Sequence, residues 1–295
     1  MTDALTVVDR TQVKPLLSTG WVRGLDNDDY HTGPGLSHSG LKRLMKSPWH
    51  YFAVAHEHDR HESAPSPQMF AGTLCHCAVL EPNQFDRRYR VGPEVNKNSN
   101  AWKEFKAANP GAEIISAKQR EIAFAQASAL RAHPIVAELL SCGEPELSLY
   151  WRDPATDVLC KCRPDWVHRC GTLEHPAAIL MDVKTTGDAS AEGFSKAVAN
   201  FGYHTQADWY CTGYEQAFPG VRCEGMVFAV VENEFPYAAA AYMLDEETLT
   251  IARERNRRGL NRYAECEAKA LWPCYPSELQ VISLPRYELM RERAA

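Results

Sequence analysis

Apolar residues in the first half of the chain recur at the spacing of helices that bury one face. This periodicity predicts a helix that begins at Ser37 or Ser39 and ends near residue 45, followed by a second short helix after Pro48. Further helices are predicted over residues 68–80, 101–108 and 117–132, with polar loops over 57–67 and 92–100. Residues 1–30 have few periodic apolar positions, and we expect them to form a loosely structured leader.

After Gly143 the pattern changes to the alternation and short apolar runs of strands. Strands are predicted over residues 146–153, 158–169 (with a break at Pro164), 177–186, 224–232 and 237–244. Helices are predicted over 191–200 and 203–218, and Asp245 is expected to cap a long helix that ends near residue 271. This order predicts an α/β fold with a mixed central sheet flanked by helices. We expect one domain over 31–295, with a helical N-terminal part (31–142) and an α/β core (143–271) that carries the chemistry.

Three charged residues lie in and before the apolar strand predicted over residues 177–186. Asp182 and Lys184 are two positions apart, so their side chains share one face of the strand, and Asp165 precedes them. Burial of such charges is costly unless they are paired or bind an ion. Asp165, Asp182 and a backbone carbonyl near Val183 can offer oxygen ligands to Mg²⁺, while Lys184 can orient water or stabilise charge on a phosphate. The alternative is an Asp–Lys salt bridge at a strand end, because an Asp-x-Lys pattern alone is common.

Composition limits the location and the partners of the protein. No apolar run is long enough for a transmembrane helix and no secretory signal precedes the first helix, so we expect a cytoplasmic protein without membrane contact. The net charge is −6, with 32 basic and 38 acidic residues. This balance disfavours a protein coated in basic charge, but an acidic metal site beside a local basic groove remains compatible with it.

The ten cysteines are expected to be free thiols, as is usual in the cytoplasm. Two Cys-x-Cys pairs occur. Cys75 and Cys77 fall on a predicted helix and point to opposite sides, whereas Cys160 and Cys162 share one face of a predicted strand. The second pair leaves a zinc or iron–sulfur site open, but small buried side chains explain it more simply.

Several segments, taken together and in order, resemble the RecE-type exonucleases (the exodeoxyribonuclease VIII family) of the PD-(D/E)xK superfamily. LSHSGLKRLMKSPWHY (36–51) resembles the family's opening helix pair and GTLCHCAVLEP (72–82) its histidine-bearing helix. CRPDW (162–166) resembles the first aspartate motif and DVKTT (182–186) the second, and QADWY (206–210) resembles the trailing helix motif. The interval between the two aspartates departs from the family's spacing, and residues 169–177 look like an enlarged hairpin turn.

The resemblance implies roles for residues that the pattern alone leaves ambiguous. His76 lies on a small, apolar helix face and would otherwise be a core histidine; the resemblance makes it a catalytic residue and metal ligand. It also implies an acidic catalytic residue at Glu146, with Glu144 as the competing choice. Gln206 and Tyr210 share a helix face, and the resemblance directs them toward the scissile phosphate rather than into simple packing.

Other polar residues are candidates for DNA contacts. Lys161 and Arg163 precede Asp165 and could bind phosphates, with ordinary surface charge as the alternative. Thr185 and Thr186 could donate to phosphate or cap the next helix. Basic residues on the last long helix (Arg255, Arg258 and Arg262) are interleaved with glutamates, which favours a solvated, salt-bridged helix.

The resemblance implies an Mg²⁺- or Mn²⁺-dependent exodeoxyribonuclease that hydrolyses one strand of linear double-stranded DNA from its ends, 5′ to 3′, in recombination. It further implies a single-strand annealing protein as partner and a ring-shaped homo-oligomer. One alternative is a repair or CRISPR-associated nuclease with an iron–sulfur cluster, which the scattered Cys211, Cys223, Cys266 and Cys274 disfavour. Another is a catalytically inactive DNA-binding protein of the same fold, which the intact charged set disfavours.

Overall fold

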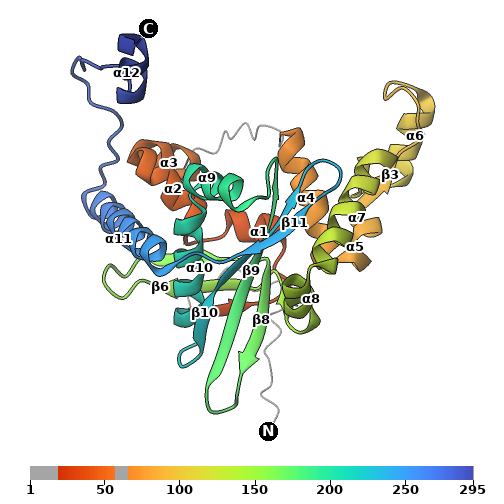
Figure 1. Ribbon diagram of the computed structural model, residues 1–295, viewed down its shortest axis with the longest axis horizontal. Helices are drawn as coiled ribbons and strands as arrows, with labels where there is room; N and C mark the ends of the chain where they lie inside the picture. Colours follow the sequence, from red (N-terminus) through yellow and green to blue (C-terminus); the bar gives the residue numbers. More distant parts are fainter. Residues whose placement is uncertain (1–18, 57–65, 295) are drawn as a thin grey trace.

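The computed structural model describes residues 19–56 and 66–294, and it has two main sheets and a peripheral strand pair among helices (Figure 1). The helices are α1 (Asn27–Thr32), α2 (His38–Lys46), α3 (Pro48–His56), α4 (Pro67–Leu80), α5 (Pro82–Arg88), α6 (Asn100–Ala108), α7 (Ala117–Ala132), α8 (Pro134–Ser141), α9 (Ala191–Phe201), α10 (Tyr203–Ala217), α11 (Glu246–Lys269) and α12 (Arg286–Ala294). The strands are β1 (Gly20–Val22), β2 (Leu36–Ser37), β3 (Tyr89–Val91), β4 (Glu113–Ile115), β5 (Glu144–Pro145), β6 (Ser148–Arg152), β7 (Leu159–Cys162), β8 (Trp166–Gly171), β9 (Pro176–Thr186), β10 (Arg222–Glu232) and β11 (Ala239–Tyr242).

The central sheet has the strand order β11-β10-β9-β8-β5. Strands β9 and β10 run parallel, while the other neighbours are antiparallel, so the sheet is mixed. A second sheet, β1-β6-β7-β2, lies beside it, and β3 pairs with β4 on an arm that also carries α6. The mixed central sheet with flanking helices agrees with the fold predicted from the hydrophobic pattern.

The two faces of the central sheet pack against two different hydrophobic cores. Leu180 and Phe228 face α9 and α10, in a core that also includes the second sheet and α11. Met181 and Val227 face α4, α7 and α8 on the other side. This division follows from the two-residue period of a strand, and it explains why the middle parts of β9 and β10 are apolar on both faces.

Local capping determines where several helices begin. Ser37, rather than Ser39, caps α2 by accepting from the Gly40 N–H at 3.1 Å. Asp245 caps α11 as predicted, and the helix ends at Lys269, two residues before the expected end. None of the described helices is both long and apolar enough to cross a membrane.

Three expectations need correction. The predicted leader (1–30) is wrong for residues 20–30, where β1 pairs with β6 and α1 buries Tyr30; residues 1–18 and most of the predicted loop 57–67 lie outside the described part. The break predicted at Pro164 is more than a local one, because residues 158–169 form two strands, β7 and β8, in different sheets. The enlarged turn predicted over 169–177 is short, because β8 and β9 stay paired out to Gly171 and Pro176.

Candidate functional site

Two carboxylates lie at the corners where the chain passes between the two main sheets. Glu146 follows β5 of the central sheet and precedes β6 of the second sheet, and Asp165 lies at the reverse passage from β7 to β8. The Glu146 N–H donates to the Asp165 carbonyl at 3.1 Å, so the two corners are joined. Glu146 has a φ of 53°, in the left-handed region. Both carboxylates therefore lie at the same place although 19 positions separate them in the sequence.

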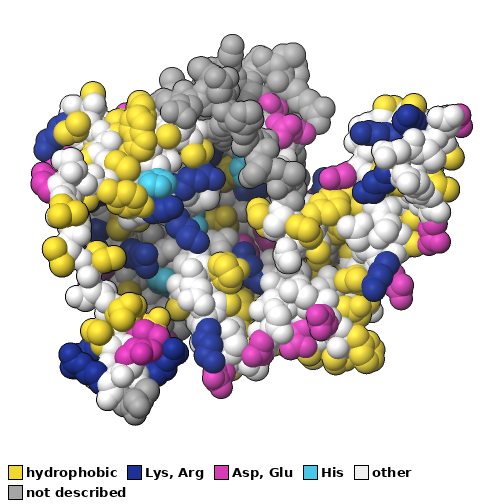
Figure 2. Space-filling view, turned by 90° about the horizontal axis from the view of Figure 1, so that it is seen from above, with side chains coloured by type: hydrophobic (Ala, Val, Ile, Leu, Met, Phe, Trp, Pro, Cys, Tyr) yellow, Lys and Arg dark blue, Asp and Glu magenta, His cyan; other side chains and the backbone are white. Residues whose placement is uncertain are grey.

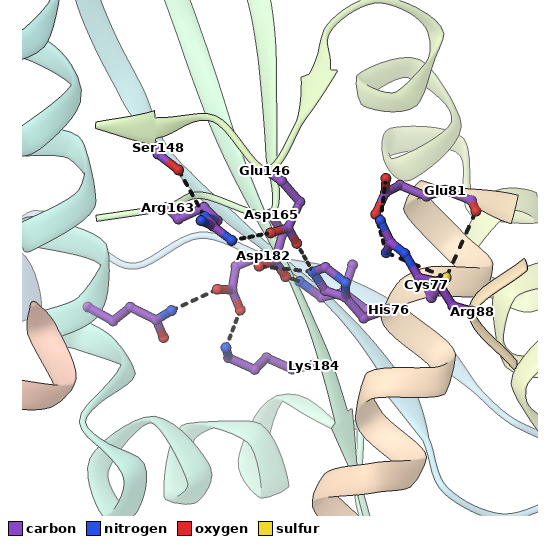
Figure 3. A network of polar contacts seen from close by, with 12 residues as sticks. His76, Cys77, Glu81, Arg88, Glu146, Ser148, Arg163, Asp165, Asp182 and Lys184 are labelled. Carbon is purple, nitrogen blue, oxygen red and sulfur yellow. Dashed lines mark hydrogen bonds and ion pairs between the residues drawn. The ribbon is translucent and has the colours of Figure 1, made fainter. Parts of the chain in front are cut away.

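His76 of α4 faces this pair of carboxylates (Figure 3). Its Nε2 lies 3.1 Å from Asp165 Oδ1 and 3.3 Å from Glu146 Oε1. Burial alone would lower the pKa of His76, but the charges of Asp165 and Glu146 outweigh it and raise the pKa to about 9. The ligand atoms of the three side chains all lie within 4.8 Å of one another.

This set of donors fits a divalent cation. Two carboxylates and an imidazole would balance its charge and give a mixed oxygen and nitrogen environment, which suits Mn²⁺ well and leaves open positions for the waters that Mg²⁺ retains. A cation would have to displace the proton that the carboxylates now hold on His76, because a metal-bound imidazole is neutral. We refer to His76, Glu146 and Asp165 as the carboxylate–histidine cluster.

Each carboxylate of the cluster is held by a second contact. Asp165 Oδ2 accepts from the Val183 N–H at 2.8 Å, which ties the corner to β9. Glu146 Oε2 pairs with Arg163 Nη1 at 3.3 Å, and Arg163 Nε donates to Ser148 Oγ at 3.0 Å. Burial raises the pKa of Glu146 although His76 opposes that shift. The competing residue, Glu144, is engaged elsewhere, with Arg23 and Arg169.

Asp182 and Lys184 form an ion pair next to the cluster, in which Asp182 is buried and Lys184 is partly exposed. Asp182 Oδ2 contacts Lys184 Nζ, and Oδ1 accepts from Gln206 Nε2 of α10 at 2.7 Å. Burial, together with the nearby charge of Asp165, raises the pKa of Asp182 to about 6, although Lys184 opposes the shift. Burial disfavours charge on Lys184, but Asp182 and Asp165 outweigh it and raise its pKa, so its ammonium stays protonated. Lys184 Nζ also lies 4.7 Å from the centroid of the Tyr203 ring.

The structure brings together most of the residues expected at the site. His76, Glu146, Asp165, Asp182, Lys184 and Gln206 form one connected group, whereas Tyr210 lines a neighbouring cavity with Gln206. Asp182 directs its oxygens to Lys184 and Gln206, so its predicted role as a metal ligand stays a prediction, as does that of the Val183 carbonyl. Tyr203, at the start of α10, lies beside Lys184 although the hydrophobic pattern does not single it out.

A cleft of about 1120 Å³ opens onto the carboxylate–histidine cluster. Its walls come from α4, from the end of β9 and from the end of α9, and they include Lys184, Thr185 and Thr186. Seen from above, Lys, Arg and His side chains gather in the hollow of this face (Figure 2). The predicted phosphate contacts of Thr185 and Thr186 stay predictions; Thr186 Oγ1 also accepts from the Asp188 N–H at 3.3 Å, which closes the turn before α9.

The predicted DNA contact of Lys161 is wrong, whereas that of Arg163, which lines the cleft, stays a prediction. Lys161 is 3% exposed, and its ammonium donates to the carbonyls of Tyr30 and Gly33, each at 2.6 Å. Arg163 is 9% exposed and donates to Ser148, Glu146 and two carbonyls before α1. Both cations stabilise the fold around α1, and Arg163 positions Glu146.

Replacing Lys161 with methionine should therefore destabilise the fold without removing a contact to DNA. The free energy of unfolding should fall by roughly 2–3 kcal/mol, because buried carbonyls lose a charged donor. Urea denaturation measures it, with Lys196→Met as a control in an exposed ion pair on α9, where the change should stay within about 0.5 kcal/mol. Unchanged stability together with weaker DNA binding would return Lys161 to the DNA interface.

The cysteines give no support for a metal cluster. In residues 19–56 and 66–294, no group of three or more with metal-ligand spacing contains a cysteine. Cys160 and Cys162 are buried in the core beside α10, and Cys274 is exposed beyond α11.

Arg258 of α11 pairs with Glu254, as expected for a salt-bridged helix.

Comparison with known proteins identifies the family. Residues 37–285 match the model of the PDDEXK-like domain of unknown function (DUF3799). No significant match was found among curated protein sequences. The fold is similar to the crystal structure of a “putative exonuclease” from Eubacterium rectale, with a TM-score of 0.58 and 13% sequence identity over 90% of this chain and 97% of that chain. The structural likeness concerns the fold, whose α/β core is that of the PD-(D/E)xK nucleases, and the family match shows that this chain belongs to the PDDEXK-like domain family DUF3799.

Proposed function

We propose that this protein is a metal-dependent exodeoxyribonuclease of the RecE type, which hydrolyses one strand of linear double-stranded DNA. The observation that carries the proposal is the carboxylate–histidine cluster beside the Asp182–Lys184 ion pair, at the carboxyl end of β9 and open to the cleft. A family match and a fold of this class support nuclease chemistry at that position.

His76, Glu146 and Asp165 are the residues that would hold the cation. When bound, Mg²⁺ or Mn²⁺ would polarise the phosphodiester and lower the pKa of an attacking water. The contacts of Asp165 with the Val183 N–H and of Glu146 with Arg163 restrict both carboxylates before any substrate arrives. Carboxylates held in this way would keep a bound cation in a fixed position relative to the reacting phosphate.

Lys184 would stabilise negative charge on the phosphate as a cation. Its pKa is raised, so it holds its protons at neutral pH and serves as a donor rather than as a base. Asp182 restrains the ammonium, and Gln206 restrains Asp182 in turn through the 2.7 Å hydrogen bond. Gln206 is thus proposed as a positioning residue behind the ion pair, and Tyr210 as a neighbour of the substrate in the cavity that both line.

The finer parts of this proposal rest on the sequence resemblance. These are 5′-to-3′ polarity, a role in recombination, a single-strand annealing protein as partner and a ring-shaped homo-oligomer. The charge balance is compatible with a ring, because a chain with a net charge of −6 has no overall excess of basic charge to retain DNA, and enclosure would keep the enzyme on its substrate.

A digestion that compares DNA ends with closed DNA tests the proposed function. With Mg²⁺, a linear duplex should be degraded to nucleotides, whereas a covalently closed circle of the same sequence should stay intact. Linearising the circle with a restriction enzyme should make it a substrate, which controls for sequence. Equal loss of closed circles would indicate an endonuclease, and no digestion of either DNA would reject nuclease function.

A further inference from the structure

A continuous stack of aromatic rings runs from the protein core to the mouth of the cleft. Tyr242 stacks on Phe194 with ring centroids 5.3 Å apart, and Phe194 stacks on Tyr203 at 5.9 Å. Tyr203 in turn stacks on Phe201 at 5.6 Å, with an interplanar angle of 30°. Phe194 is 2% exposed, whereas Phe201 at the outer end is 55% exposed. The inner rings of the stack are therefore packed against the protein, and the outermost ring, that of Phe201, is exposed to solvent.

The backbone fixes the outer end of this stack. Phe201 is the last residue of α9, and Gly202 has a φ of 74° that ends α9 and starts α10. Lys42 Nζ donates to the Phe201 carbonyl at 2.8 Å. The exposed ring is thus presented from an ordered turn between two helices.

Phe201 and Tyr203 line two cavities at once. One is the cleft over the carboxylate–histidine cluster, and the other is a neighbouring cavity of about 340 Å³ that also contains Gln206 and Tyr210. Asp182 and Lys184 lie at this boundary, since Gln206 contacts Asp182 and Tyr203 contacts Lys184. A strand whose phosphate met Lys184 would therefore pass the aromatic pair on its way from one cavity to the other.

The lining of the second cavity favours a nucleic-acid strand over an apolar partner. Its other lining side chains are hydroxyl, basic or imidazole groups and tyrosine, among them Ser37, Ser39, Lys42 and His31, and none of its described lining residues is acidic. Basic and hydroxyl groups suit a sugar–phosphate backbone, while aromatic faces stack on any base without reading its sequence.

We propose that Phe201 and Tyr203 form a stacking platform for one unpaired nucleobase beside the scissile phosphate. The inference rests on the proposed nuclease function and adds to it: the reacting strand is separated from its complement at this point. Phe201 supplies the open ring face, and Tyr203 supports that ring while it holds the ammonium of Lys184.

Binding of a single-stranded oligonucleotide that carries 2-aminopurine tests the platform. With Ca²⁺ in place of Mg²⁺, wild-type protein should quench 2-aminopurine at one position of the oligonucleotide. Phe201→Ala should lose that quench and bind about five- to hundredfold more weakly, the loss of one base–aromatic stack, and Phe201→Trp should restore both. Phe235→Ala is the matched control, because Phe235 is 87% exposed and lines neither cavity. Thermal unfolding confirms that each variant is folded.

An abasic site at the quenched position provides an independent measure. It should weaken binding to wild-type protein but not to Phe201→Ala. Equal binding of the two oligonucleotides by wild type, normal binding by Phe201→Ala, or a smaller oligomer mass in that variant would overturn the platform. Wild-type protein that quenches 2-aminopurine without hydrolysing DNA would reject the proposed nuclease and leave the platform standing, so the two failures are distinguishable.

Discussion

Removal of divalent cations with EDTA is expected to abolish DNA hydrolysis, and Mg²⁺ or Mn²⁺ in excess is expected to restore it. His76, Glu146 and Asp165 lie within 4.8 Å of one another, and they present two carboxylates to one point. Ca²⁺ should bind without supporting turnover, because it prefers more ligands at longer distances and acidifies water less. The release of labelled nucleotides measures the rate, and calorimetric titration with Mn²⁺ measures binding.

Two glutamates offer a matched control for this expectation. Glu146→Gln should weaken Mn²⁺ binding and lower activity, whereas Glu144→Gln should leave Mn²⁺ binding unchanged, because Glu144 contacts Arg23 and Arg169 instead of His76. Full hydrolysis in EDTA would contradict the metal mechanism. Loss of Mn²⁺ binding in Glu144→Gln alone would place the metal elsewhere.

Lys184→Ala is expected to lower the single-turnover rate by at least about a hundredfold. The lysine would stabilise the charge that develops on the phosphate, and loss of one such preorganised group typically costs about 3–4 kcal/mol at the transition state. Mn²⁺ affinity should change much less than the rate, because Lys184 pairs with Asp182 outside the carboxylate–histidine cluster. Rapid-quench cleavage at saturating metal separates the two effects.

Lys196→Ala is the control for Lys184→Ala. Lys196 lies on α9 in an exposed ion pair with Glu192, and its loss should leave both rate and stability near wild type. Circular dichroism checks that Lys184→Ala is folded, since the change leaves Asp182 buried without its cation. A near-normal rate in folded Lys184→Ala would show that the site is misplaced.

The hydrophobic pattern predicted the longer helices and strands that face a core, because burial imposes a period on the sequence. It missed the short helices α5 and α8, although Phe85, Val136 and Leu139 are buried in a core. It could not predict the passage from one sheet to another at Asp165, since β7 and β8 alternate in the same way in either sheet. It also could not predict β1 and α1, which are short and are held by contacts with β6 and Lys161, more than 100 positions away in the sequence.

The sequence predicted those site residues whose position in a strand or motif leaves few alternative roles, and it left the other site residues ambiguous. Asp182 and Lys184 follow from strand geometry, because residues two apart share a face. The same reasoning does not distinguish Glu144 from Glu146. In the structure Glu146 has a left-handed backbone and contacts His76, whereas Glu144 contacts Arg23 and Arg169. The prediction that Lys161 contacts DNA failed for a related reason. Its partners are backbone carbonyls, which leave no signature in a sequence.

The long hairpin of β8 and β9 has a practical consequence for labelling the protein. Its turn, residues 172–175, carries a fully exposed Leu173, and Pro176 precedes Asp182 by six residues of extended strand, about 20 Å. The strands stay paired from Trp166 and Met181 out to Gly171 and Pro176, so a complete ladder of paired residues would separate an inserted peptide from the carboxylate–histidine cluster. Exposed turns of this kind accept insertions readily. A fluorophore or affinity tag placed there would follow the protein on DNA without entering the cleft.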